Sequence, residues 1–187
     1  KRMFHKLLLN FTWWVNREDS EGNNIFEGGF LGLDNIGVFD LRQPLPGGGR
    51  LDQSDGTAWA AAYALSMMRM AIELALHDPA YEDLAAKFFA HFMFIAEAVH
   101  ATGGNGEQGL WDELDQFYYD VLRQPGRAPV TLRVRSVVGL LPLMAVQVLD
   151  EGVLDKLPHL SAQMDWFLAH RPELAALVAD WRAPNPQ

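Results

Sequence analysis

Apolar residues recur at intervals of three and four along most of the chain, the spacing that places them on one face of an α-helix. The segment 57–77 is apolar on nearly every side, and its strongly polar positions, Ser66, Arg69 and Glu73, form one thin stripe. Such a helix is typical of the interior of a larger helical body. The pattern predicts six helices, at about 2–16, 57–77, 80–101, 137–149, 153–169 and 172–181.

Residues with helix-start and helix-stop preferences support these boundaries. Asp55 is suited to cap the second helix, and Asp78 followed by Pro79 is suited to begin the third. Gly103 and Gly104 favour a stop after the third helix. Pro142 is expected to bend the fourth helix because proline lacks the N–H donor.

Two long segments, 17–56 and 103–136, lack helical periodicity. Nine of the sixteen glycines fall in the first, and the second contains an alternating stretch, Val130 to Val134, that predicts one strand of a short β-hairpin. Irregular loops of this length are uncommon in compact domains and are usually functional when they occur. Any binding or catalytic residues are therefore expected in these two segments.

Composition and charge narrow the class of protein. The 187 residues are 49% hydrophobic, which excludes intrinsic disorder, and the net charge of −9 argues against nucleic-acid binding. Cysteine is absent, so thiolate metal sites and cysteine nucleophiles are excluded, and the six histidines lack metal-ligand spacing. The longest apolar stretch carries Arg69 and Glu73, so it is expected to be a buried helix rather than a membrane-spanning one.

Asp34 is the candidate with the clearest chemistry. It lies among glycines and apolar residues, including Leu33 and Ile36, and apolar surroundings raise the pKa of a carboxyl toward the range of a general acid. The alternative is that Asp34 and Asn35 form a turn in a structural loop, which composition alone favours. A calcium loop beginning at Asp19 is not supported, because Phe30 stands where the bidentate glutamate would be.

Aromatic residues gather around these loops. Trp59 and Trp111 adjoin glycine, aspartate and glutamine residues, and tryptophan rings pack on the C–H faces of sugars while polar side chains bind the hydroxyls. The alternative for any single tryptophan is a place in the core. That alternative is weaker for Trp13 and Trp14, since adjacent helix positions do not face one core. The acidic turn at 112–115 favours solvated side chains over a cation site.

Four sequence segments are shared with a known family: GGFLGLDNIGVFD, LDQSDGTAWA, LWDE…FYYDVL and RVRSVVGLLPL. With them the chain resembles the bacterial branch of glycoside hydrolase family 63, and the resemblance runs through nearly the whole sequence. It implies an all-α fold: about half of an (α/α)6 toroid of helical hairpins, with long irregular loops and one short β-hairpin. It also implies that residues 1–187 form a single catalytic domain truncated at both ends.

The same resemblance assigns roles to residues. It implies hydrolysis of α-glycosidic bonds with inversion and Asp34 as the general acid; we expect no cofactor and no metal site. The substrate-binding residues would be Phe30, Asn35, Gln53, Asp55, Trp59 and Trp111. The general base would be a Glu outside this chain, because twelve helices with their connections need on the order of 300 residues. The fragment alone is therefore expected to be inactive.

Partners and alternatives follow from these expectations. The expected partners are a carbohydrate substrate and the remainder of the same domain, with no nucleic acid and no membrane, in a cytoplasmic protein whose native N-terminus is not present. One alternative is a non-catalytic helical module that binds carbohydrate or another protein. Another is a trehalase-like or mannosylglycerate-cleaving enzyme. The sequence leaves the sugar and its linkage open.

Overall fold

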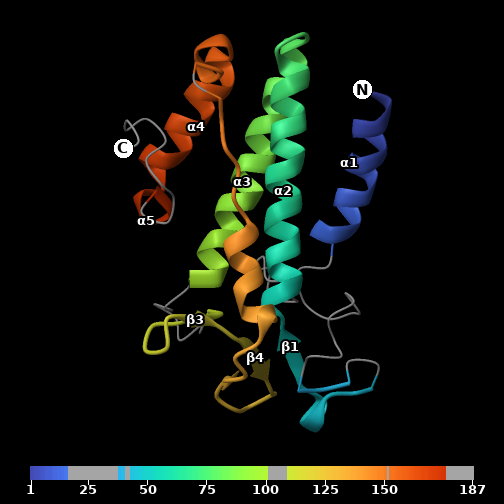
Figure 1. Ribbon diagram of the computed structural model, residues 1–187, viewed down its shortest axis with the longest axis vertical. Coiled ribbons are helices and arrows are strands. Elements are labelled where there is room, and N and C mark those ends of the chain that lie inside the picture. The colour runs from blue at the N-terminus through green and yellow to red at the C-terminus, as the bar shows by residue number, and fades with distance from the viewer. Residues whose placement is uncertain (17–37, 41–42, 101–108, 151, 176–187) are drawn as a thin grey trace.

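The computed structural model describes residues 1–16, 38–40, 43–100, 109–150 and 152–175. Five α-helices of the described chain stand above a group of short strands (Figure 1). The helices are α1 (Arg2–Val15), α2 (Ser54–Ala75), α3 (Glu82–His100), α4 (Pro158–His170) and α5 (Pro172–Ala175). The strands are β1 (Arg50–Asp52), β2 (Trp111–Asp112), β3 (Phe117–Tyr118), β4 (Asp120–Arg123) and β5 (Val130–Leu132).

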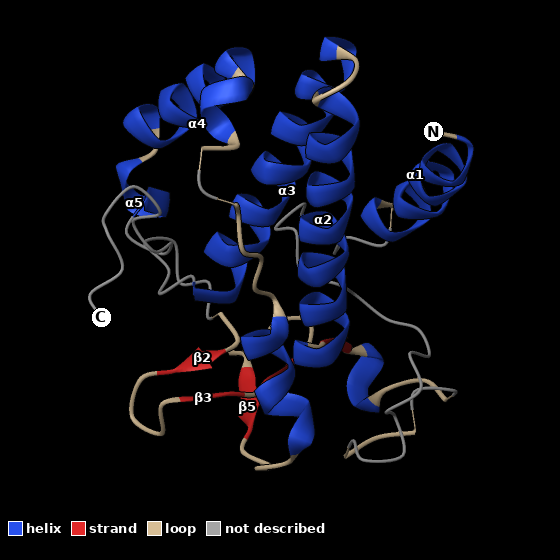
Figure 2. Cartoon of the chain, turned by 45° about the horizontal axis from the view of Figure 1, so that its top comes forward, coloured by secondary structure: helices blue, strands red, loops and turns tan. Residues whose placement is uncertain are grey.

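Helices α2 and α3 form the centre, with α1 on one side and α4 on the other (Figure 2). The tight connection between α2 and α3 is a 3-10 turn, Pro79–Tyr81, and the Asp78 side chain accepts a hydrogen bond from Ala80 N at its start. The main core consists of fully buried side chains from this pair, such as Ile72 and Met93. α1 inserts Phe4 and Phe11 into this core, and α4 inserts Leu160 and Met164.

The strands form two small antiparallel sheets at the other end. One has the order β1-β4-β5, with Leu51 opposite Leu122 and Val121 opposite Thr131; the other pairs β2 with β3. A second, smaller apolar cluster joins these sheets to the lower ends of α2 and α3. Its buried members are Ala61, Ile95, Val99, Leu110, Tyr118 and Val121.

The expected all-α half-toroid is wrong: helices are combined with a three-stranded and a two-stranded antiparallel sheet, so the fold is mixed α/β. The predicted strand near 130–134 is confirmed as β5. Its sheet neighbour β4, however, bonds in turn to β1 about 70 residues earlier in the sequence. Parts of both segments expected to be irregular loops are therefore strands of one sheet.

The fourth predicted helix is also absent as an α-helix. Residues Val137–Met144 form a 3-10 helix, and the chain then runs without regular structure to residue 150. Pro142 removes a backbone donor, and Val137, Val138 and Val146 are β-branched, so this segment has a low propensity for an α-helix. The fifth predicted helix divides into a 3-10 turn, Leu154–Lys156, and α4.

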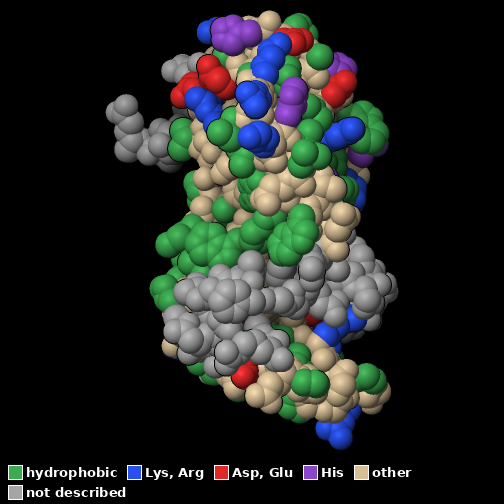
Figure 3. Space-filling view, turned by 90° about the vertical axis from the view of Figure 1, so that its right-hand side faces the viewer, with side chains coloured by type: hydrophobic (Ala, Val, Ile, Leu, Met, Phe, Trp, Pro, Cys, Tyr) green, Lys and Arg blue, Asp and Glu red, His purple; other side chains and the backbone are tan. Residues whose placement is uncertain are grey.

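The face of the molecule that carries α1 is partly apolar. Charged and histidine side chains gather at its upper end, and hydrophobic side chains are exposed below them (Figure 3). α1 contributes the exposed Leu9 and Trp13 to the hydrophobic surface of the molecule. Among the described helices, none combines the length and hydropathy that a membrane span requires.

Candidate functional site

The start of α2 holds an unusual concentration of buried polar residues. Residues 51–58 are all buried, and they include five of the six buried polar or charged residues in the described chain. Buried polar side chains need hydrogen-bond partners, so a run of them indicates a region built for more than apolar packing. The five are Asp52, Gln53, Ser54, Asp55 and Thr57.

The backbone and side chains of the first turn bond to one another. The Gln53 carbonyl accepts hydrogen bonds from Thr57 N at 3.2 Å and from Thr57 Oγ1 at 2.6 Å. Asp55 Oδ1 accepts from Gly56 N at 2.7 Å, and a carboxylate here is favoured by the positive end of the helix dipole. Asp55 is thus in the first turn, and Gln53 occupies the N-cap position expected for Asp55. Gln53 Oε1 is buried without a hydrogen-bond partner in the described chain.

Asp120, the first residue of β4, anchors this helix start to the sheet. Its Oδ1 accepts hydrogen bonds from Ser54 N and Ser54 Oγ, each at 2.8 Å. Burial raises the pKa of the Asp120 carboxyl, and the two bonds from Ser54 oppose that rise. A carboxyl with a raised pKa at a helix start is the kind of group from which acid–base chemistry is built.

A buried ion pair lies directly beneath. Asp52 is 1% exposed, and its carboxylate pairs with Arg123 of β4 at 2.5 Å and lies 3.8 Å from Arg50 Nε. Arg50 and Arg123 are opposite each other in the antiparallel register, so Asp52 separates two like charges. The ion pair joins β1 to β4 two residues before the start of α2.

A small cavity borders Ser54 and Asp120 and brings distant parts of the chain together. Its lining includes Val38 and, from the segment before the 3-10 helix, Ser136. Gly139, which also lines the cavity, allows the 3-10 helix to lie close to β3. A Cβ at this position would lie 2.2 Å from Phe117 Cε1 and 2.3 Å from the Tyr118 carbonyl oxygen. The volume of about 20 Å³ admits one water molecule and no sugar.

The predicted site residues divide into three groups. Gln53 and Asp55 are brought together in the first turn of α2, and Trp59 follows one turn later, partly exposed. Trp111 lies on β2, where its ring packs on Tyr118 with centroids 4.8 Å apart. Asp34, Phe30 and Asn35 lie outside the described residues.

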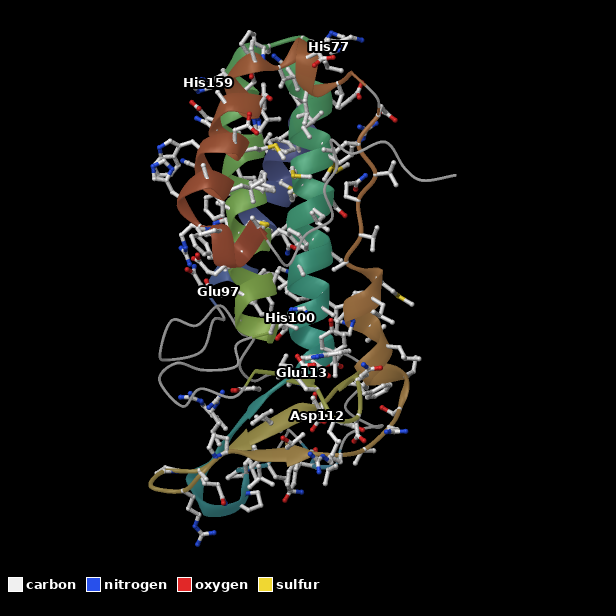
Figure 4. The ribbon with its side chains drawn as sticks, turned by 90° about the vertical axis from the view of Figure 1, so that its left-hand side faces the viewer. His77, Glu97, His100, Asp112, Glu113 and His159 are labelled. Carbon is white, nitrogen blue, oxygen red and sulfur yellow. The ribbon has the colours of Figure 1, made fainter. Side chains whose placement is uncertain are left out.

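The acidic turn between β2 and β3 is neutralised by arginines. Asp112 pairs with Arg133 at 2.8 Å, and Asp115 pairs with Arg135 at 2.9 Å and accepts a hydrogen bond from Tyr119 Oη. Figure 4 shows Asp112 and Glu113 among the strands, at the end of the molecule opposite His159. In the described chain no group of three or more acidic or histidine side chains is arranged to hold a metal ion.

Sequence reasoning missed Asp120 and Asp52 as members of this region. Asp120 stands alone between Tyr119 and Val121, and an isolated carboxylate inside an apolar run is a usable signal of a buried acid. No comparable signal links Asp52 to Arg123, because the two residues meet only through strand pairing across 71 positions.

Comparisons with known proteins give a relative without functional information. No family model matches the chain, and no solved structure matches it. The protein named "Uncharacterized protein YMR196W" of Saccharomyces cerevisiae is 50% identical over 184 residues. The match covers 93% of this chain and 17% of the yeast protein, so the chain spans about one sixth of the length of the curated relative it matches.

Proposed function

We propose that the chain forms part of an inverting α-glycosidase that cleaves α-glycosidic bonds of oligosaccharides or small glucosides, with Asp34 as the general acid. One observation carries the proposal. Each of the four segments that resemble glycoside hydrolase family 63 contributes at least one residue to the lining of the same cavity, the one beside Ser54 and Asp120. Segments with a shared catalytic task are expected to meet in this way, although they are dispersed over 100 residues of sequence.

The position of Val38 supports the assignment of Asp34. Val38 lines the cavity and follows Asp34 by four residues, a length of chain that spans at most about 14 Å. The neighbourhood already contains the carboxyls of Asp55 and Asp120. A further carboxyl placed within this neighbourhood would have its charged form disfavoured by these acidic side chains, which would suit a proton donor that works near neutral pH.

The second carboxylate of the reaction would come from elsewhere. An inverting glycosidase needs two carboxyl groups roughly 6.5–9.5 Å apart, with a water molecule activated by the base. The base would be a Glu in the remainder of a longer polypeptide, so this chain alone would not turn over substrate. The cavity itself is too small for a sugar, and the substrate would lie at its border, near Gln53 and Trp59.

The test is Asp34→Asn in the full-length polypeptide, assayed on maltose, trehalose, mannosylglycerate and longer α-linked oligosaccharides. Loss of the proton donor is expected to lower kcat by about 100-fold or more, with an unchanged melting temperature. Asp78→Asn, at the opposite end of α2, is the matched control and is expected to keep full activity. Near-normal turnover in Asp34→Asn would refute the assignment, and the preferred substrate would decide between a glucosidase, a trehalase-like enzyme and a mannosylglycerate hydrolase.

A second candidate is a non-catalytic carbohydrate-binding module. It is favoured by the observation that Ser54, Thr57 and Asp120 use their polar atoms in bonds to one another or to the helix backbone. For this candidate the full-length protein would bind α-linked oligosaccharides without hydrolysing any of them.

A further inference from the structure

A second, larger hollow lies at the other end of the molecule, between α3 and α4. Its volume is about 540 Å³, within the range of roughly 300–1,000 Å³ typical of small-molecule sites. Phe89 and Phe167 line it together with small residues such as Ala86 and Ala90. Hydrophobic contacts behind it attach α4 to the core.

Trp166 forms one exposed wall of this groove. It is 62% exposed, an unusual state for the largest apolar side chain. Its ring stacks on His170 with centroids 4.2 Å apart and an angle of 25° between the planes. His170 Nδ1 is in turn 2.7 Å from the Trp166 carbonyl oxygen, so the stacked pair is tied to the helix backbone. The indole is therefore a supported flat surface.

Polar groups gather at the other side of the groove. Asp83 Oδ1 lies 3.0 Å from His159 Nε2 and accepts from Gln163 Nε2 at 3.1 Å. Gln163 Oε1 is buried without a hydrogen-bond partner in the described chain. Lys87, exposed at the rim, makes no ion pair or hydrogen bond with the described residues. His159 is labelled at the upper end of α4, away from the strands (Figure 4).

We infer that the α3–α4 groove is a second carbohydrate-binding site, which takes a pyranose on Trp166 and its hydroxyls on Asp83, Lys87 and Gln163. The groove is defined by its volume and its lining residues. The choice of carbohydrate as the ligand class rests on the proposed function. The site is separate from the start of α2, because Asp83 and His159 lie at the far end of the central helices.

The chemistry of the groove favours a polyhydroxy ligand over a purely apolar one. The C–H groups on one face of a pyranose carry partial positive charge, and the face of an indole ring is negative. Hydroxyl groups both donate and accept, so they can satisfy the Gln163 carbonyl, the Asp83 carboxylate and the Lys87 ammonium at once. An apolar occupant would cover the Gln163 carbonyl oxygen and the Lys87 ammonium and leave both without a hydrogen-bond partner.

The experiment measures binding of maltotriose to the chain by saturation-transfer NMR and calorimetry. Wild-type chain is expected to bind, and Trp166→Ala is expected to weaken binding at least ten-fold. Trp13→Ala, another exposed tryptophan on a distant helix, is the matched control and is expected to bind within two-fold of wild type. Gln163→Leu, which keeps the size of the side chain but removes its polar atoms, is expected to weaken binding as well.

Two results would overturn the inference: no binding of maltotriose to the wild-type chain, or equal binding by wild type and Trp166→Ala. Circular dichroism of each variant separates lost binding from lost folding. The outcome is distinguishable from that for the proposed function. If Trp166→Ala loses binding while Asp34→Asn keeps full turnover, the groove is supported as a binding site and the catalytic assignment is wrong. If Trp166→Ala keeps binding while Asp34→Asn loses turnover, the catalytic assignment is supported and the inference about the groove is wrong.

Discussion

The two ends of the helical pair α2–α3 are built on different principles. Around the upper part the side chains are apolar, and Glu82 is the only buried charged or polar residue that the described chain places there. At the lower end five consecutive or nearly consecutive polar residues are buried, with Asp120 and Arg123 supplied by the sheet. An apolar core tolerates many arrangements of similar volume, whereas a buried polar network requires particular partners. The lower end is therefore where a specific chemical task is expected.

The largest effect is expected from Asp52→Ala at the polar end. The substitution removes the buried partner of Arg123 and leaves Arg50 and Arg123 opposite each other across the β1–β4 pair. Breaking a buried pair in this way costs about 3–5 kcal/mol. Urea unfolding followed by circular dichroism would measure the loss.

Asp52→Asn is the matched variant for this test. It keeps the shape and one acceptor but removes the charge, so its loss of stability is expected to be smaller than that of Asp52→Ala. Unfolding free energies of Asp52→Ala within 0.5 kcal/mol of wild type, roughly the scatter of ordinary surface substitutions, would show that the network at the polar end is not required.

An intermediate effect is expected from the single buried acid at the apolar end. Glu82 Oε2 accepts a hydrogen bond from Leu160 N at 2.7 Å and so caps the first turn of α4 from outside the helix. Glu82→Ala would leave that N–H without its acceptor and lower the stability by about 1–2 kcal/mol. Thermal unfolding is the measurement.

Glu82→Gln keeps an acceptor oxygen and is expected to retain most of the stability. If the glutamine and alanine variants melt together, the role of Glu82 in capping α4 is wrong. Since α4 forms one wall of the groove at Trp166, loss of the cap is also expected to weaken maltotriose binding.

The same contrast explains what the sequence could and could not predict. Helices α1 and α3 follow from apolar periodicity, because each packs one face on the core. The strands β1, β2 and β3 contain two or three residues each, too few to show an alternating pattern. Gln53 and Asp55 were predicted together because the family resemblance implies substrate-binding roles for both within one short segment, LDQSDGTAWA. The bonds from Ser54 to Asp120 join residues 66 positions apart, and no local pattern reports such a contact.

The smallest effect is expected from Asp120→Asn, and it is a dependence on pH. Burial raises the pKa of Asp120 above its ordinary value of 3.8, so the folded state binds this proton more tightly than the unfolded state does. The stability contributed by Asp120 is therefore complete below its ordinary pKa and is lost as the pH rises through the raised value. Asparagine does not titrate, and its carbonyl oxygen can still accept both bonds from Ser54. The stability of Asp120→Asn relative to wild type should thus increase from pH 3 to pH 7, measured by urea unfolding at each pH.

Asp78→Asn supplies the control of opposite sign. Hydrogen bonds from Lys1 and from Ala80 N lower the pKa of Asp78, so its contribution is present above the ordinary pKa and is lost as the pH falls through the lowered value. The stability of Asp78→Asn relative to wild type should therefore decrease as the pH rises. Parallel curves for the two variants would contradict the difference between a solvated, paired carboxylate at the apolar end and a buried one at the polar end. Curves of opposite slope would locate the group whose proton affinity is raised by folding beside the start of α2, at Asp120.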